Sequence, residues 1–206
     1  MNETSVKILR PGIVKLSSDS QSCVAEATIS LVEGEKNILV DTGDADDKKF
    51  LIKTLKNENL EVDDIDIVVI THNHPDHNAN RDIFPNARIY GGDSFYWRRN
   101  PKSYEFYPSD FFGGKPIELD KNTRLINTPG HSSSNFDVSV LAETEKGVYG
   151  IVGDLFWSEN DYKTNTEYVA LVDDKNKQDK SREKMKNLAD YIVPGHGDAF
   201  KVKKLI

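Results

Sequence analysis

The feature that most constrains this chain is a cluster of histidines that directly follows a short apolar run. The sequence reads IVVITHNHPDH over residues 67–77, so three of the five histidines fall within six residues. The apolar run is typical of a buried strand, which would place the histidines in the loop at its end. His72 and His74 point the same way if the chain is extended there. The proline that follows redirects the chain, so Asp76 and His77 can approach from another side. This geometry indicates two adjacent metal sites.

The other two histidines and one aspartate stand in short, turn-bounded strings later in the chain. His131 lies in TPGH, His196 lies in PGHG, and Asp154 follows an apolar run in GIVGD. Taken singly, such a histidine is more often a surface or packing residue, and such an aspartate more often caps the next segment. Together with the histidine cluster, a metal-binding role is favoured for them, because imidazoles are common metal ligands and a carboxylate can bridge two cations. We therefore expect all of them to belong to one metal centre.

The pattern of apolar runs predicts a mixed α and β protein. Hairpins are expected over 23–43 and 136–154, strands over 67–70 and 123–130, and helices over 48–58 and 174–190. The last of these helices is polar and is expected on the surface. A chain of 206 residues is long enough for one sizeable core, so we expect a single domain over 1–206.

Composition and charge narrow the class of protein. The net charge of −7 gives no general attraction to nucleic acid, so a polyanion would need a local positive site. The first sixteen residues lack the apolar core of a signal peptide, and no run is long enough to span a bilayer. The single cysteine, Cys23, agrees with a reducing compartment. A cytoplasmic protein with no membrane partner is expected.

The motifs resemble, in order, those of the metallo-β-lactamase superfamily. LVDTGD, THNHPDH, TPGH, GD and PGHG are similar to its successive motifs and extend over nearly the whole chain. The resemblance implies an α/β (α+β) fold, the αββα metallo-β-lactamase sandwich, with a binuclear site at one edge. It implies a first ion held by His72, His74 and His131, a second held by Asp76, His77 and His196, and Asp154 as the bridge. Asp41 would orient a ligand by hydrogen bonding. The alternative, which the sequence favours as much, is that Asp41 stabilises only the DTG turn.

Such a centre implies hydrolysis with two Zn(II) ions per chain. Iron or manganese could occupy one or both sites, because imidazole and carboxylate ligands accept all three metals. A metal-bridged hydroxide would be the nucleophile, since two such ions lower the pKa of a shared water to about 7. Asp76 is either a catalytic proton donor to the leaving group or a ligand alone. A metal-binding module without enzymatic activity is the other class, and the complete ligand set argues against it.

A closer similarity is to the subfamily called metallo-β-lactamase domain-containing protein 1. VGDLFWSEND and VPGHGDAFKV resemble its segments, which implies a phosphodiesterase or ribonuclease acting at the 3′ end of single-stranded RNA. The string NANRD after the histidine cluster departs from that group's pattern. The alternative is an ester, thioester or lactone hydrolase, similar to glyoxalase II and the lactonases. A small molecule or a short single strand would suit a chain of this length.

The segment 93–116 offers the best indication of substrate, because it holds eight of the nineteen aromatic residues with cations among them. Aromatic rings interleaved with cations can stack bases and contact phosphates. The candidate substrate-binding residues are Tyr96, Trp97, Arg98, Tyr104 and Phe111. Equally, the aromatic residues pack a long connection onto the domain or form a homodimer contact.

Overall fold

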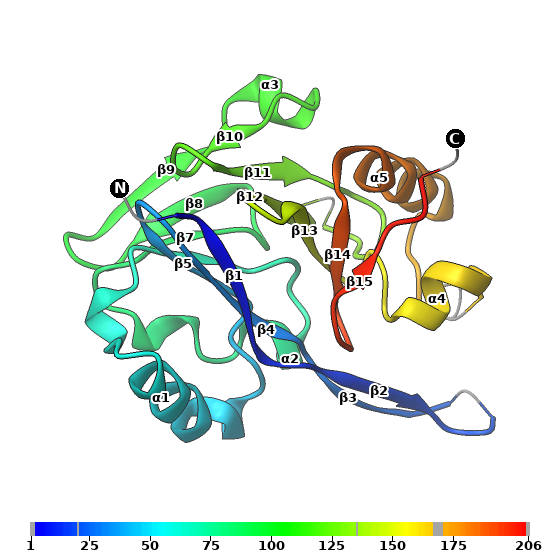
Figure 1. The fold of residues 1–206 in the computed structure, drawn as a ribbon, viewed down its shortest axis with the longest axis horizontal. Helices are drawn as coiled ribbons and strands as arrows, with labels where there is room; N and C mark the ends of the chain where they lie inside the picture. Colours follow the sequence, from blue (N-terminus) through cyan, green and yellow to red (C-terminus); the bar gives the residue numbers. More distant parts are fainter. Residues whose placement is uncertain (1–2, 20, 135, 167–170, 205–206) are drawn as a thin grey trace.

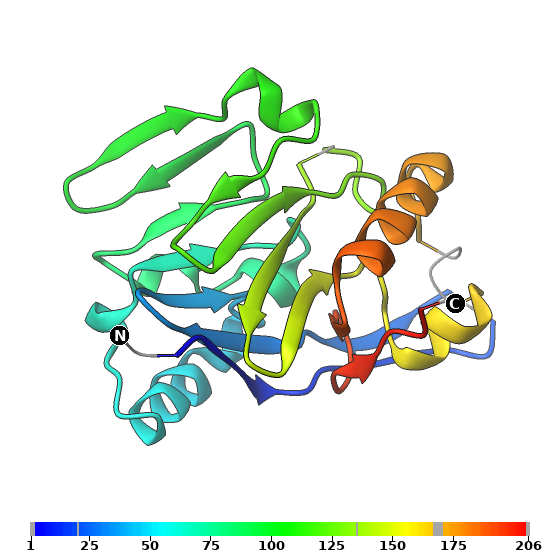
Figure 2. The ribbon, with the colours of Figure 1, turned by 45° about the horizontal axis from the view of Figure 1, so that its top comes forward.

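Two β-sheets lie face to face in the computed structural model of the chain, and a helix covers the outer face of each (Figure 1). The structure describes residues 3–19, 21–134, 136–166 and 171–204. Helix α1 (Lys48–Asn57) and helix α5 (Lys175–Leu188) lie on opposite sides of the sheets, as the turned view in Figure 2 also shows. The αββα sandwich expected from the resemblance is therefore confirmed.

The first sheet contains seven of the described strands, in the order β1-β4-β5-β6-β7-β8-β9. Strands β5, β6 and β7 run parallel, and the outer strands pair antiparallel. Their bounds are β1 Ser5–Arg10, β4 Ile29–Glu33, β5 Asn37–Val40, β6 Ile67–Val69, β7 Arg88–Tyr90, β8 Phe95–Arg98 and β9 Ser103–Phe106. The short helices are η1 Ala45–Asp47, η2 Val62–Asp64, α2 Pro75–Asn78 and η3 Arg81–Ile83. Strands β2 (Ile13–Leu16) and β3 (Cys23–Glu26) form a separate hairpin that projects from the sandwich (Figure 1).

The second sheet contains six of the described strands, in the order β10-β11-β12-β13-β14-β15. Strands β13 and β14 pair in parallel, and the other neighbours are antiparallel. Their bounds are β10 Ile117–Glu118, β11 Thr123–Asn127, β12 Val138–Thr144, β13 Gly147–Gly153, β14 Tyr191–Pro194 and β15 Phe200–Lys201. Two short helices, α3 Ser109–Phe112 and α4 Glu159–Thr164, lie in the connections.

The cores follow from the alternation of side chains along the strands. Ile38 and Val40 of β5 belong to the core between the sheets, whereas Leu39 belongs to the core beneath α1. Helix α1 contributes Leu51 and Leu55, which are four residues apart and so lie on one face of the helix. A third core lies beneath α5, which makes the sandwich four layers thick.

The parallel strands bring the chemistry-bearing side chains to one edge of the sandwich. Asp41 follows β5 and His72 comes two residues after Ile70, just beyond the end of β6. In the second sheet, Asp154 follows β13 and His196 follows β14. The carboxyl ends of parallel strands lie at the same edge of a sheet, which is where sites of α/β proteins are built. The two sheets meet at this edge.

Some local expectations differ from the structure. The expected hairpin over 23–43 is confirmed only for β4 and β5, because residues 23–26 pair with β2 instead. No helix within the described ranges is both long and apolar enough to cross a membrane.

Candidate metal centre

Seven side chains at this edge form two neighbouring groups of potential metal ligands. Within each group, one nitrogen or oxygen atom from every residue lies within 4.8 Å of the others. The first group is His72, His74, His131 and Asp154, and the second is Asp76, His77 and His196. The structure thus brings together all seven residues named as ligands from the sequence; the six others divide as expected, and Asp154, expected as the bridge, is grouped with the first set.

Asp154 lies between the two groups. Its Oδ2 atom is 3.5 Å from Nε2 of His131 and 3.8 Å from Nε2 of His72. Its Oδ1 atom is 3.3 Å from Nε2 of His77 and 3.2 Å from Nε2 of His196. Oδ2 also lies 3.3 Å from Nε2 of His196, so the carboxylate contacts histidines of both groups, as a bridging ligand requires.

Hydrogen bonds outside the cluster orient three of the imidazoles. His77 Nδ1 lies 2.7 Å from Asp41 Oδ2, and His196 Nδ1 lies 2.9 Å from the carbonyl oxygen of Glu26. Both acceptors require a proton on Nδ1, which leaves the lone pair on Nε2. These outer bonds thus assign the tautomer in which Nε2 can bind a metal.

His72 is oriented in the same way through a hydroxyl group. Thr71 Oγ1 donates to Asp41 Oδ2 at 2.8 Å, so its oxygen can accept from His72 Nδ1 at 3.1 Å. Asp41 also accepts from the backbone N–H of Thr71 at 2.7 Å. It holds a left-handed φ of 61°, an uncommon conformation outside glycine. These contacts of the carboxylate are with Thr71 and His77, so they support its expected role in orienting a candidate ligand, whereas stabilisation of the DTG turn stays a prediction.

Three atoms that face each other in the cluster have no hydrogen-bond partner in the part of the chain that the structure describes. They are Asp76 Oδ2, His77 Nε2 and Asp154 Oδ1, and all three are buried. Buried polar atoms are nearly always paired, so their shared direction indicates a ligand between them. The donor set of imidazole nitrogens and carboxylate oxygens fits a divalent transition metal such as zinc.

Burial and charge move the pKa values of the cluster apart. Burial and the charge of His77 lower the pKa of His72 well below its ordinary value. Burial also disfavours charge on His77, but the carboxylates of Asp41 and Asp154 outweigh it and raise the His77 pKa well above the ordinary value. Burial disfavours charge on Asp154, but His196 and His77 outweigh it and hold the Asp154 pKa well below its ordinary value. An ionised Asp154 and a protonated His77 therefore neutralise each other.

Two glycines in the later motifs allow the strands to approach the cluster closely. A Cβ atom on Gly195 would overlap Asp154 Oδ1, and one on Gly153, where φ is 53°, would overlap the Thr71 hydroxyl. Only glycine leaves this space and adopts positive φ without strain. The GD and PGHG strings are thus needed for the positions of their own ligands.

Helix α5 supports the segment that follows Asp154 through buried polar side chains. Gln178 Nε2 donates to the carbonyl oxygen of Asp154 at 3.2 Å. Arg182 donates to the carbonyl oxygen of Leu155 at 2.9 Å and to Asp161 Oδ2 at 2.8 Å. The sequence analysis missed these residues and expected this helix to be only a solvated face. Their one signal in the sequence is spacing, since 178, 182 and 185 lie on one helical face.

A pocket of about 530 Å³ opens beside the first ligand group. It is lined by Asn73, His74, His131, Ser132, Ser133, Ser134, Leu171, Val172 and Asp173. No lysine or arginine occurs among these described lining residues. Asp173 is the one carboxylate among them, and the others are the two histidines and neutral residues. The volume lies in the range of small-molecule sites.

The structure divides the five residues predicted to bind substrate. Phe111 is 1% exposed and stacks on Tyr107 in the core between the sheets. Trp97 packs against the core beneath α1, and Tyr96 stacks on Tyr90. The packing alternative is therefore favoured for these three, and Phe111 is wrongly placed on a substrate surface, because a side chain in the core cannot stack a base.

Tyr104 and Arg98 are accessible but do not reach the metal centre. Tyr104 is 56% exposed on β9, the outermost strand of the first sheet. Arg98 is paired with Arg88 at the start of β7, the end of the strand opposite to the histidine loop. None of the five residues lines the pocket beside His74. The homodimer contact stays a prediction.

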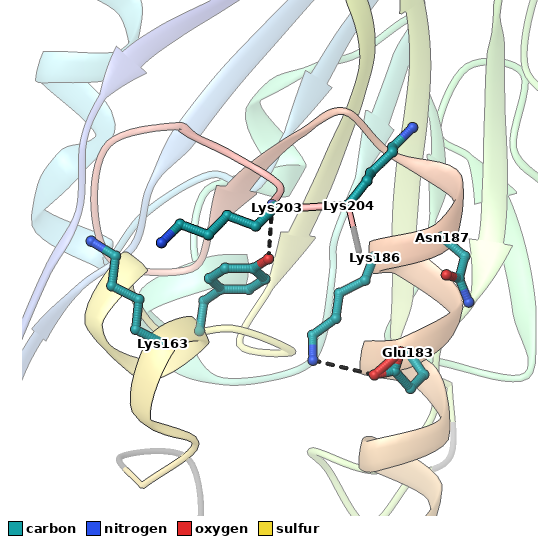
Figure 3. Close-up of a pocket in the computed structure, with 7 residues that line it drawn as sticks. Lys163, Glu183, Lys186, Asn187, Lys203 and Lys204 are labelled. Carbon is teal, nitrogen blue, oxygen red and sulfur yellow. Dashed lines mark hydrogen bonds and ion pairs between the residues drawn. The ribbon is translucent and has the colours of Figure 1, made fainter. Parts of the chain in front are cut away.

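A larger surface hollow of about 750 Å³ lies elsewhere, between α4, α5 and the segment after β15 (Figure 3). Its lining comprises Tyr162, Lys163, Glu183, Lys186, Asn187, Lys203 and Lys204. Three of the four lysines have carboxylate partners: Lys163 with Glu159, Lys186 with Glu183 and Lys204 with Asp190. No metal-ligand candidate lines this hollow, so size alone does not identify the site.

Comparison with known proteins supplies the family context. A family model described as the metallo-beta-lactamase superfamily matches residues 26–196. An uncharacterized protein of Caenorhabditis elegans is 34% identical over 85% of this chain and 49% of its own length, so this chain spans about half of that relative. Metallo-beta-lactamase domain-containing protein 1 of Xenopus laevis is 32% identical over 87% of this chain and 74% of its own length. A probable metallo-hydrolase of Methanocaldococcus jannaschii is 33% identical, covering 82% and 75% of the two chains.

The fold likeness extends to solved structures at lower identity. AidC, described as a dizinc quorum-quenching lactonase in complex with a product, superposes with a TM-score of 0.63. The match is 20% identical and covers 85% of this chain and 73% of that one. At this identity the likeness concerns the fold.

Proposed function

Because this chain belongs to the metallo-β-lactamase superfamily of metallo-hydrolases, we propose that it is a binuclear zinc-dependent hydrolase of a small, uncharged ester, thioester or lactone. The position of Asp154 carries the binuclear proposal, since its carboxylate lies within 3.8 Å of histidine nitrogens of both groups. The first ion would be held by His72, His74 and His131, the second by Asp76, His77 and His196, and Asp154 would contact both.

When bound, such a pair of cations would acidify a shared water and polarise the substrate carbonyl. Outer hydrogen bonds fix which nitrogen of His77 and of His196 would face the cations once the ring has lost its Nε2 proton. The Nδ1–H of His77 donates a hydrogen bond to Asp41, and the Nδ1–H of His196 donates one to the carbonyl oxygen of Glu26. The rings therefore need no tautomeric change before they bind a metal.

Asp76 has a further proposed role as the group that passes a proton to the leaving atom. Its side chain is 15% exposed, against 6% for Asp154, so it is the more accessible carboxylate of the cluster. Its Oδ2 atom faces His77 Nε2 at 3.6 Å. We propose that this oxygen is the ligand atom and that the other oxygen exchanges the proton.

The pocket beside His74 and His131 supports the choice of substrate class. Its described lining contributes hydroxyl groups, two aliphatic side chains and one carboxylate, but no cation. An RNA chain would be repelled by Asp173, and no lysine or arginine of the described lining would contact its phosphates, so the proposed cations alone would attract it. A neutral carbonyl compound with an apolar part fits this lining. The lactonase likeness at the level of the fold agrees with this choice.

The test combines metal analysis with a substrate panel. Zinc-loaded protein would be assayed with an aryl ester, a thioester, a lactone and a short single-stranded RNA labelled at its 3′ end. We expect about two zinc ions per chain and turnover of at least one carbonyl substrate, lost in Asp154→Asn and retained in Asp63→Asn, an exposed carboxylate. Fewer than one metal per chain with full activity would contradict the binuclear centre. RNA cleavage that depends on Asp154, without ester turnover, would contradict the substrate class.

A further inference from the structure

A second charged pocket lies at the edge of the first sheet that is opposite to the metal centre. It measures about 190 Å³ and is lined by Lys36, Asp66, Ile67, Asn86, Arg88, Tyr90 and Arg98. Ile67 and Arg88 are the first residues of β6 and β7, whereas the metal ligands follow the ends of their strands. None of the proposed metal ligands lines this pocket, so it is separate from the metal centre.

Two arginines of this pocket lie directly opposite each other. Arg88 of β7 and Arg98 of β8 are partners in an antiparallel ladder, so their side chains emerge on the same face of the sheet. Like charges in this position destabilise a sheet. Glu105 lies 3.1 Å from Arg88 and neutralises one of the two charges.

The second arginine has no such neighbour. The side chain of Arg98 makes no hydrogen bond or ion pair with any residue in the described ranges, and its buried Nε atom is unpartnered. A desolvated guanidinium donor normally has an acceptor. Lys36 adds a third cation, with its Nζ atom 2.6 Å from the carbonyl oxygen of Leu119 and no carboxylate partner among the described residues.

The remaining groups leave an excess of positive charge. Asp66 is the one carboxylate among the described lining residues, and it accepts from the backbone N–H of Asn37 at 2.9 Å. Three cations against Asp66 and Glu105 leave one net positive charge. Burial raises the pKa of Tyr90 and outweighs the opposing effect of Arg88, so its hydroxyl keeps a proton that it can donate.

We propose that this pocket binds the phosphate group of a small molecule, with Arg98 and Arg88 as its principal donors. Guanidinium groups present paired N–H donors that match phosphate oxygens, and Lys36 adds a point charge. At about 30 Å³ per water, the volume of about 190 Å³ is enough for a phosphate group and a few waters. A bound phosphate would neutralise the charge of Arg98, whereas Glu105 neutralises only that of Arg88.

Calorimetric titration of the zinc-loaded full chain with inorganic phosphate tests this site. We expect Arg98→Met to weaken binding at least about tenfold, the loss that corresponds to one charged contact. Arg99→Met is the matched control, because this neighbouring arginine is exposed and contacts the carbonyl oxygen of Asp82 instead. It should bind phosphate as the parent does. Without phosphate, Arg98→Met should unfold at the same temperature as the parent or above it, since a like-charge contact is removed.

A second comparison separates this pocket from phosphate binding at the metal centre. His196→Ala alters the metal centre and should retain the binding that Arg98→Met loses. Equal affinity of the parent and Arg98→Met, or loss in His196→Ala alone, would overturn the proposal. Glycerol phosphate that binds more tightly than inorganic phosphate would identify an organic phosphomonoester as the ligand, and equal binding would identify the free anion. Acetate should not compete, and competition by acetate would contradict selectivity for phosphate.

Discussion

The Oδ2 atom of Asp41 lies 2.7 Å from Nδ1 of His77, and both side chains are buried. This contact links a residue in a left-handed conformation to a ligand of the second group, and it also accounts for the raised pKa of His77. The carboxylate therefore has two effects on metal binding: it fixes the ring, and it stabilises the proton that a metal must displace.

Replacement of Asp41 by alanine should weaken the second metal site more than the first, because Asp41 contacts His77 directly but reaches His72 only through Thr71. Loss of an outer partner of a ligating histidine typically costs about 10- to 100-fold in metal affinity, and His77 would lose its fixed tautomer. Competition with a chromophoric chelator would measure the two zinc affinities. Asp41→Asn, which keeps an oxygen acceptor, should lose less. Unchanged affinity for both ions in Asp41→Ala would show that Asp41 stabilises only the turn.

Metal binding at neutral pH should release protons. His77 and His196 have raised pKa values in the folded chain, because Asp41 and Asp154 outweigh the effect of burial on His77 and Asp154 outweighs it on His196. Both rings therefore keep their second proton to a higher pH than an ordinary histidine does. His72 has a lowered pKa and so loses this proton at a lower pH. The apparent zinc affinity should therefore fall as the pH is lowered. Calorimetry at pH 7 in buffers of different ionisation enthalpy should show a net release of protons; zero release would contradict the charge assignment.

Removal of the metal should lower the unfolding temperature. A ligand that binds only the folded state stabilises it by about 2.7 kcal/mol at one hundred times its dissociation constant. For a chain of this size that corresponds to roughly 5–10 °C. Thermal unfolding with zinc and with a chelator measures the difference, and His196→Ala, which lacks one ligand, should show a smaller one. Identical curves with and without chelator would mean that the cluster holds no stabilising metal.

Arg182→Met should destabilise the fold by about 3–5 kcal/mol. The change leaves the buried carboxylate of Asp161 without its guanidinium partner, which is costly in a dry interior. It also removes the hydrogen bond to the Leu155 carbonyl beside Asp154. Urea unfolding gives the free energy, with Lys180→Met as a control, because Lys180 is exposed on the same helix. Equal losses in the two variants would contradict a specific role for the buried pair.

The clustering of the candidate metal ligands could be predicted from the sequence, because each stands in a short string whose form restricts its position. His72 and His74 follow an apolar strand, and the glycines before Asp154 and His196 are required by close approach. The αββα layers could be predicted only through the resemblance, since apolar runs define strands but not which of them share a sheet. The strand 23–26, for example, pairs with β2 and not with its nearest apolar neighbour.

The residues whose positions the sequence analysis did not predict are placed by tertiary contacts. Gln178 and Arg182 lie in a helix of high polarity, and such residues are usually exposed unless buried groups accept their hydrogen bonds. Here the acceptors are the carbonyl oxygen of Asp154 and the carboxylate of Asp161. In the aromatic segment, composition did not reveal the strand register. That register turns Tyr96 toward the core and sets Arg98 opposite Arg88, far from the residues that it was expected to assist.

Each ligand group combines residues of both sheets. The first joins His72 and His74 to His131 and Asp154, and the second joins Asp76 and His77 to His196. A cation in either group would therefore act as a cross-link between the two halves of the chain. Resistance of the halves to separation under mechanical load or partial denaturation would then depend on the metal supply, so the centre would set the cooperativity of the fold as well as its chemistry.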